Sequence, residues 1–279
     1  MEVCALNTNL RNKIAGAIYG FAIGDAMGAT TEFMHKDEIK KEYGIVKDII
    51  GGGWLNLQPG EVTDDTQMTA CVMKAIMKRP RDVNEFKKFC IDNFILWLKS
   101  NPKDIGAQCA KGINYSIAFN GNIPVDDTAL GNGSLIRAMP LAILNLPYYN
   151  IMQGILTHNN RICSEFIESY TELLQSYLND NYNNLYTYKI KGLLEPSGYI
   201  VNTFNNSVYW ANQGSFKKAI IGAVNHGGDA DTIAAITGSL AGAKYGLDAI
   251  PKRWINQLNP NVKEFLEEFK NFVFDCLQI

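Results

Sequence analysis

The sequence lacks several features that would place it in a familiar class at once. Its six cysteines form no Cys-x-x-Cys pair and its three histidines are scattered, so neither a zinc site nor a dithiol redox motif is indicated. No basic run exceeds two residues and the formal net charge is only −2, so the positive field that nucleic acid binding requires is missing. Any anionic ligand must therefore be held by a local site.

Long apolar runs are also missing. The apolar stretches rich in small residues are interrupted by Asp25, Asn225 and Lys244, so no segment of about 20 residues suits a bilayer, and no secretory leader is recognisable. The cysteines mostly fall on apolar stripes, which is typical of buried free thiols in a reducing compartment. We therefore expect a cytoplasmic protein with no membrane partner. No repeat, long linker or coiled-coil seam is visible, which predicts one domain over residues 1–279 and a monomer.

What the sequence has in abundance is helical periodicity. Apolar residues recur at intervals of three and four over residues 86–98, 162–177 and 262–276, which predicts amphipathic helices there. A further apolar helix is expected over residues 135–144. No segment of comparable length alternates with a period of two, and the β-branched residues within 45–50 stand alone. The pattern predicts an all-α fold, a compact bundle of many helices.

Four glycines, Gly16, Gly20, Gly24 and Gly28, follow one another at four-residue intervals along the first expected helix. Each glycine inside a helix costs about 1 kcal/mol relative to alanine, so the set is unfavourable unless a close contact compensates for it. Either another helix packs tightly on this face, or the face also lets a ligand approach. The expected helix over residues 233–246 is similarly poor in side-chain bulk, which predicts a central position in the bundle.

Two expected helix starts carry the same acidic pattern. They are Thr63-Asp64-Asp65-Thr66 and Gly227-Gly228-Asp229-Ala230-Asp231-Thr232. One such motif alone is typical of helix capping, because Thr and Asp accept hydrogen bonds from the first backbone N–H groups of a helix. Capping needs one side-chain acceptor per helix, however, and two helix starts with paired carboxylates exceed that need. Oxygen ligands of this kind suit Mg²⁺, Mn²⁺ or Ca²⁺ rather than zinc, and two metal ions would use them all.

Together with further motifs, these residues resemble the ADP-ribosylglycohydrolase family over most of the chain and in the family's order. The motifs are residues 16–20 and 24–28 with Glu32, residues 63–66, Asp104-Ile105-Gly106, Gly131-Asn132-Gly133-Ser134 with Arg137 and Pro140, Thr157-His158, Ser197-Gly198-Tyr199 and residues 227–232. Each piece is short, but the ordered set is specific.

The resemblance implies an all-α, single-domain fold with two Mg²⁺ or Mn²⁺ ions at its centre. It implies an enzyme that removes ADP-ribose from a protein side chain or a small acceptor. The implied metal ligands are Thr63, Asp64, Asp65, Asp229, Asp231 and Thr232. The implied contacts to the substrate are Asp104, Gly106, Gly131, Asn132, Gly133, Ser134 and His158, with backbone amides of residues 131–134 facing the diphosphate and His158 contacting the nucleotide.

Glu32 is the acidic residue that the resemblance places beside the metals. Cleavage of the bond at C1″ of the ribose passes through an oxocarbenium-like transition state, which ordinary glycosidases stabilise with two carboxyl groups. If metal ions replace one of them, Glu32 remains as the acid/base. It then orients or deprotonates the attacking water, or protonates the leaving group.

Two other functions stay open at this point. The fold implied by the resemblance also occurs in proteins without turnover, so a catalytically silent ADP-ribose-binding protein or a crystallin-like structural protein is an alternative. A two-metal phosphohydrolase acting on the diphosphate is another, and its products, AMP and ribose phosphate, would differ from intact ADP-ribose. The acceptor is also open: arginine, serine, a modified nucleic acid end or O-acetyl-ADP-ribose.

Overall fold

The computed structural model describes residues 2–119, 121–181 and 192–279, and the side chains from residue 7 onward. Helix makes up 66% of the structure, and no strand occurs in the described residues. Two isolated β-bridges, Gly52 with Leu57 and Gly131 with Tyr199, are the extended pairings found there. The prediction of an all-α fold is confirmed.

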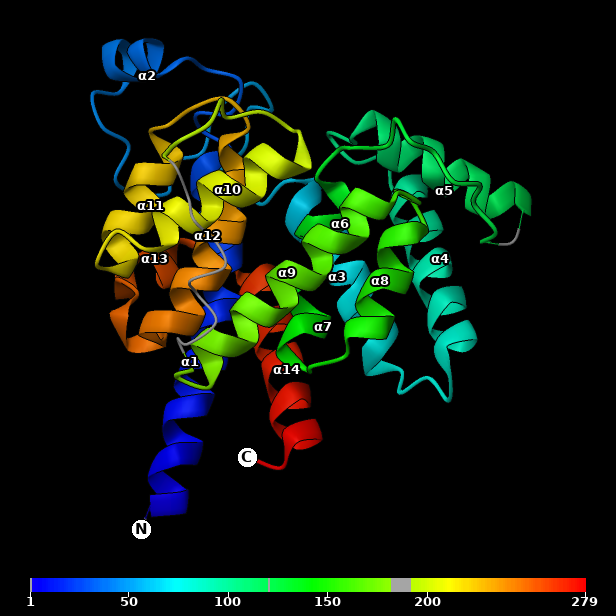
Figure 1. The fold of residues 1–279 in the computed structure, drawn as a ribbon. Coiled ribbons are helices and arrows are strands. Elements are labelled where there is room, and N and C mark those ends of the chain that lie inside the picture. Colours follow the sequence, from blue (N-terminus) through cyan, green and yellow to red (C-terminus); the bar gives the residue numbers. More distant parts are fainter. Residues whose placement is uncertain (1, 120, 182–191) are drawn as a thin grey trace.

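The helices surround a central pair, α1 and α12, as Figure 1 shows. Their bounds are α1 (Glu2–Gly28), α2 (Lys36–Glu42), α3 (Asp64–Met77), α4 (Val83–Lys99), α5 (Ala107–Phe119), α6 (Gly133–Ile136), α7 (Met139–Ile143), α8 (Pro147–Ile155), α9 (Arg161–Leu178), α10 (Ile200–Ala211), α11 (Phe216–Val224), α12 (Ala230–Tyr245), the 3₁₀ helix η2 (Leu247–Ala249), α13 (Lys252–Gln257) and α14 (Pro260–Leu277).

The predicted helices agree with the structure except at residues 135–144. The three amphipathic segments correspond to α4, α9 and α14. The fourth is divided into α6 and α7, with the fully buried Arg137 between them. Pro140 accounts for the break, because its ring clashes with the carbonyl of the residue four positions earlier, Ile136, where α6 ends.

Burial in the described part of the chain agrees with the sequence analysis. Cys71, Cys90, Cys109 and Cys163 are buried free thiols, whereas Cys276 is exposed. None of the described helices combines the length and the apolar character that crossing a membrane requires.

The glycines of α1 lie against the small residues of α12. The two helices are antiparallel, since Gly16 faces Gly242 and Gly28 faces Ala230. A Cβ atom built on Gly28 would lie 2.5 Å from the carbonyl oxygen of Ala230, and one on Gly20 would overlap the carbonyl of Gly238. The glycine face is therefore a helix–helix contact, and it brings the end of α1 to the start of α12.

Replacing Gly20 by alanine is expected to destabilise the protein by about 3 kcal/mol, because the added methyl group meets backbone that cannot yield. Helix propensity alone would give the opposite sign, a stabilisation of about 1 kcal/mol. Urea unfolding measures the difference. Gly106→Ala is the control, since a Cβ there would meet nothing within 4 Å; equal effects of the two changes would contradict this account of the α1–α12 contact.

Candidate active site

The site begins with Asp25, a fully buried residue of α1. Its carboxylate accepts hydrogen bonds from the backbone N–H groups of Thr63, at 3.1 Å, and Thr66, at 3.0 Å, and from the Thr66 hydroxyl. Asp25 thereby fixes the start of α3 against α1, with Asp64 and Asp65 in the first turn of α3. The sequence analysis gave Asp25 no role, although a single charged residue in the apolar, glycine-rich stretch of residues 14–28 is a signal for one.

The segment that follows α1 is tied to the loop before α12. Phe33 N–H donates to the carbonyl of Gly228 at 2.7 Å, and Gly228 N–H donates to the carbonyl of Met34 at 2.9 Å. Phe33 has a φ of 61°, in the left-handed region that a residue with a bulky side chain rarely adopts. These constraints place Glu32 beside the start of α12.

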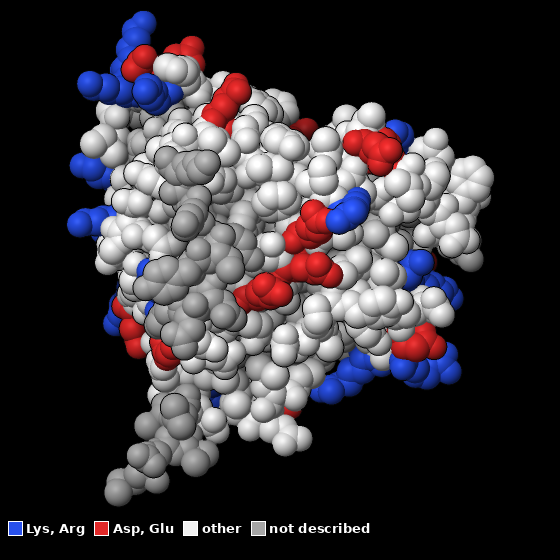
Figure 2. Space-filling model, in the orientation of Figure 1, with Lys and Arg blue, Asp and Glu red and all other residues white. Residues whose placement is uncertain are grey.

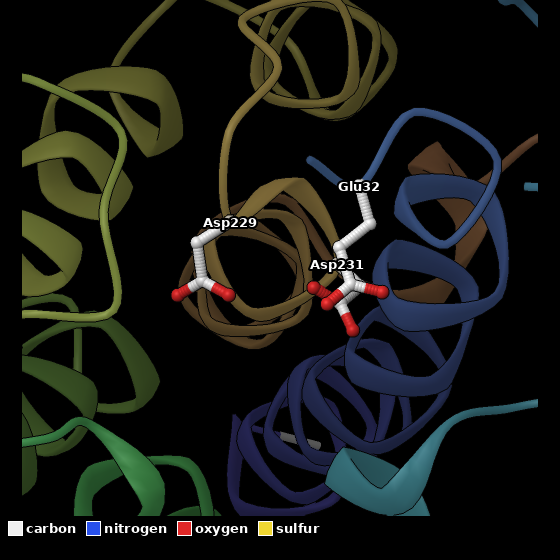
Figure 3. Close-up of side chains that lie close together, drawn as sticks. All are labelled: Glu32, Asp229 and Asp231. Carbon is white, nitrogen blue, oxygen red and sulfur yellow. The ribbon is translucent and has the colours of Figure 1, made fainter. Parts of the chain in front are cut away.

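Glu32, Asp229 and Asp231 form a carboxylate cluster, in which one oxygen of each residue lies within 4.8 Å of the others. Figure 3 shows Glu32 coming from the segment after α1, and the two aspartates coming from the start of α12. The first turn of α3 joins this cluster, because the Thr232 hydroxyl donates to Oδ2 of Asp65 at 2.9 Å. The two acidic helix starts of the sequence therefore meet at one place.

Burial and mutual repulsion raise the pKa values of these carboxyl groups. Burial raises the pKa of Asp65 and Asp231 well above its ordinary value, and neighbouring carboxylates add to the increase. Burial also raises the pKa of Asp64 to about 7, of Asp229 to about 6 and of Glu32 to about 8. Without a cation, the site is thus costly to ionise.

The same residues fit a hard divalent cation. In the described part of the chain, Oδ1 of Asp231 is buried and has no hydrogen-bond partner, so this oxygen is available as a ligand. The side chains around it offer carboxylate and hydroxyl oxygens, which Mg²⁺ and Mn²⁺ prefer. A cation would satisfy the free oxygen and relieve the repulsion that raises the pKa values.

Without metal, stability is expected to fall as the pH rises. An acid whose pKa is higher in the folded state contributes stability below its unfolded pKa, near 4, and this contribution is lost as the pH passes the folded value. The Tm of the metal-free protein should therefore decrease from about pH 4 to about pH 8, where Glu32 titrates. Circular dichroism melting with EDTA or with Mn²⁺ measures this, and Mn²⁺ should remove most of the decrease. A Tm that stays constant in EDTA would contradict the raised pKa values.

A cavity of about 250 Å³ opens beside the carboxylate cluster. The sequence-predicted residues that line it are Glu32, Asp64, Asp65, Asp104, Gly106, Gly131, Asn132, Gly133, His158, Asp229, Asp231 and Thr232. Thr63 and Ser134 do not line it: the Thr63 hydroxyl caps α3 by accepting from Asp65 N–H, and Ser134 is fully buried.

Comparison with known proteins decides the family. The family model described as ADP-ribosylglycohydrolase matches residues 6–184 and 155–277. The ADP-ribosyl-[dinitrogen reductase] glycohydrolase of Rhodospirillum rubrum is 34% identical over 277 residues, which cover 91% of this chain and 93% of the relative. The chain belongs to the ADP-ribosylglycohydrolase family.

Two further comparisons agree with this assignment. The ADP-ribosylarginine hydrolase Tri1 of Serratia proteamaculans is 28% identical over 291 residues, which cover 88% of this chain and 75% of the relative. A solved structure described as an ADP-ribosylglycohydrolase-related protein complex superimposes with a TM-score of 0.79 at 27% identity, over 97% of this chain and 99% of that chain. The prediction of a hydrolase that cleaves ADP-ribosyl linkages is confirmed at the level of the family.

In this ADP-ribosylglycohydrolase, the glycine-rich turn at residues 131–134 lines the cavity and is joined by hydrogen bonds to residues that are distant in the sequence. The Asn132 side-chain amide donates to Oδ2 of Asp229 at 2.5 Å and to the Thr203 hydroxyl at 2.9 Å. The backbone N–H of Asn132 donates to the carbonyl of Gly198, so this amide is already engaged within the fold. Asn132 therefore acts on Asp229 through its side chain, which the sequence analysis did not anticipate.

His158 lies beneath this turn and is neutral. Burial, and secondarily the nearby Arg137, lower its pKa to about 3, and its Nδ1 lies 2.8 Å from the Thr157 hydroxyl. A Cβ on Gly131 would lie 3.2 Å from Nε2 of His158, so glycine lets the turn pass over the ring. Arg137 donates to the Thr157 hydroxyl at 2.6 Å and so supports the histidine from inside the core.

Trp54 is a site residue that the sequence analysis missed. Its indole N–H donates to Oε2 of Glu32 at 2.6 Å, which favours the ionised form of Glu32 and opposes the effect of burial on its pKa. The available signal was a tryptophan directly after Gly51-Gly52-Gly53, where an exposed loop needs no large aromatic side chain.

Proposed function

We propose that this protein hydrolyses the bond between C1″ of ADP-ribose and a protein side chain, with the help of divalent cations. The observation that carries the proposal is the carboxylate cluster of Glu32, Asp229 and Asp231 beside a cavity, in a chain of this family. Water and the ADP-ribosylated acceptor are consumed, and free ADP-ribose and the unmodified acceptor are released.

Two Mg²⁺ or Mn²⁺ ions would be held by the residues of the two acidic helix starts. The proposed ligands are Asp64, Asp65, Asp229, Asp231 and Thr232, which line the cavity, together with Thr63, which lies outside the lining at the start of α3. When bound, the cations supply the positive charge that lets these carboxylates ionise together and that holds the ribose hydroxyls. Support for this assignment comes from the free Oδ1 of Asp231 and the raised pKa values around it.

The substrate would lie along the rest of the cavity lining. Its proposed contacts are Asp104, Gly106, Gly131, Asn132, Gly133 and His158, which line the cavity. Ser134 is fully buried and would support the turn from within rather than touch the substrate. The neutral His158 offers a ring without charge, which suits contact with a nucleotide base better than with a phosphate.

Glu32 is the proton carrier in this proposal. Its raised pKa of about 8 means that it holds a proton near neutral pH before cation binding, and the hydrogen bond from Trp54 fixes one of its oxygens. A carboxyl group of this kind can deliver a proton to the departing acceptor atom, or take one from the water that attacks C1″. The packing of α1 against α12 holds Glu32 at the carboxylate cluster in either role.

The site also supports the proposal that residues 1–279 act as one domain. It combines residues from α1, α3 and α12 with the turn at residues 131–134, which are distant in sequence. We further propose that the protein acts as a monomer in the cytoplasm.

Arginine is the first acceptor to test, since the Tri1 relative is named an ADP-ribosylarginine hydrolase. ADP-ribosylarginine, an ADP-ribosylserine peptide and O-acetyl-ADP-ribose are incubated with Mg²⁺ or with EDTA, and released ADP-ribose is followed by mass spectrometry. We expect release that depends on Mg²⁺ and is largest for arginine. AMP as product would identify a phosphohydrolase instead, and tight ADP-ribose binding without release would identify a silent binding protein.

A further inference from the structure

A second groove is lined by Glu32 but not by the other two members of the carboxylate cluster, Asp229 and Asp231. It has a volume of about 700 Å³ and is bounded by the loop after α1, by α2 and by the Gly53-Trp54 loop. Phe33 and Trp54 form one wall, with ring centroids 5.4 Å apart and an angle of 46° between the rings. The two side chains are 66% and 51% exposed, so their ring faces are available to a ligand.

The groove is continuous with the catalytic cavity. Glu32 and Phe33 line both, and the indole N–H of Trp54 bonds to Glu32 from the groove side. If Glu32 exchanges a proton with the leaving group, the leaving group must stand next to Glu32 and outside the cavity that holds the ribose. The groove lies next to Glu32 and meets this requirement.

The charges of the groove favour a cation. Glu38 and Glu42 of α2 line it together with Glu32, against one basic side chain, Lys41. Glu38 is partly engaged, because it accepts from His35 N–H at the start of α2. Figure 2 shows α2 as a projecting segment that carries both basic and acidic side chains at the edge of the molecule. A planar cation laid against the exposed surface of this aromatic pair gains from the rings as well as from the carboxylates.

We propose that this groove is the acceptor subsite, and that it binds the guanidinium group of an ADP-ribosylated arginine against Phe33 and Trp54. The inference rests on the proposed hydrolase function and names the residues that select its acceptor. Phe33 has a left-handed backbone conformation, which is unfavourable for a bulky residue, and it lines the groove beside Glu32. An adenine ring would also stack on these aromatic side chains, but it carries no charge to match Glu38 and Glu42.

The test measures binding in a Glu32→Gln background, where turnover does not consume the ligand. Isothermal titration gives the Kd of ADP-ribose, of an arginine-linked ADP-ribosyl peptide and of the same peptide linked through serine. Phe33→Asn is the informative change, since asparagine tolerates a φ near 61°. Because Phe33 also lines the cavity proposed for ADP-ribose, the quantity compared is selectivity: we expect the change to weaken binding of the arginine-linked peptide about 3- to 30-fold more than binding of ADP-ribose or of the serine-linked peptide.

Tyr148→Ala is the matched control, because Tyr148 is an aromatic residue of α8 that is 57% exposed and lies outside both cavities. It should leave all three Kd values unchanged. Equal weakening of ADP-ribose by Phe33→Asn would assign the groove to the nucleotide and overturn the proposal, as would an unchanged Kd for the arginine-linked peptide. If Phe33→Asn acts as expected while the wild-type protein releases no ADP-ribose, the subsite stands and the proposed hydrolysis fails.

Discussion

Asp231→Asn is expected to stabilise the metal-free protein and at the same time to abolish its response to metal. At neutral pH the buried Asp231 is costly, because burial and its neighbours raise its pKa well above the ordinary value. An amide of the same shape removes that cost, so the free energy of unfolding in EDTA should rise. Oδ1 of Asp231, however, is the free oxygen that a cation would use. Mn²⁺ should therefore no longer raise the Tm, and turnover should fall by about 10³-fold.

Asp231→Asn is expected to raise the stability of the metal-free protein and to lower turnover, and these opposite effects make the test specific. A residue that only supports the fold would lose stability together with activity, whereas a ligand site loses activity while the metal-free protein gains stability. Asp248→Asn, at an exposed position of η2, is the control and should change neither quantity. A variant that is less stable than the wild type in EDTA, or that keeps a full response to Mn²⁺, would argue against Asp231 as a ligand.

Glu32→Gln is expected to lower turnover by about 10²- to 10⁴-fold, because glutamine cannot carry the proton that the departing acceptor requires. The change keeps the shape of the side chain and an oxygen that can accept from the Trp54 indole. If Glu32 acts as acid/base, the stabilisation by Mn²⁺ should stay largely intact. The measurements are kcat with the arginine-linked substrate and the Tm with and without Mn²⁺.

The outcome also decides between two roles for Glu32, since its carboxylate lies close enough to Asp229 and Asp231 to share a cation with them. Loss of the Mn²⁺ response together with turnover would make Glu32 a ligand rather than a proton carrier. Near-normal turnover would remove it from the mechanism. Glu195→Gln, an exposed position in the segment before α10, provides the control for a charge change near the site.

The parts of the fold that sequence predicts well are those with local causes. Helical periodicity identified α4, α9 and α14, because the residues that alternate between core and solvent are neighbours in the chain. The capping pattern of Thr63 likewise marked the start of α3. The break after Ile136 also has a local cause, Pro140, but the apolar pattern of residues 135–144 concealed it.

The parts that sequence did not predict depend on contacts between distant segments. Nothing near Trp54 in the sequence indicates that its indole would reach Glu32, and nothing near Asp25 indicates that it would hold the start of α3. The side chain of Asn132 meets Asp229 across 97 residues of chain. These partners are determined by how whole helices pack against each other. The residue types in the sequence therefore indicate that a site exists, but they do not indicate which atoms meet in it.

The contact between α1 and α12 has a consequence for how the protein is made. Four glycines make α1 a weak helix on its own, and the surface that compensates for them, the start of α12 at Ala230, follows about 200 residues later. Contacts between such distant segments form slowly, because a large loop must close first. A chain leaving the ribosome therefore carries Glu32 and α3 long before it carries their partners. The candidate active site can therefore form only after the start of α12 has been synthesised.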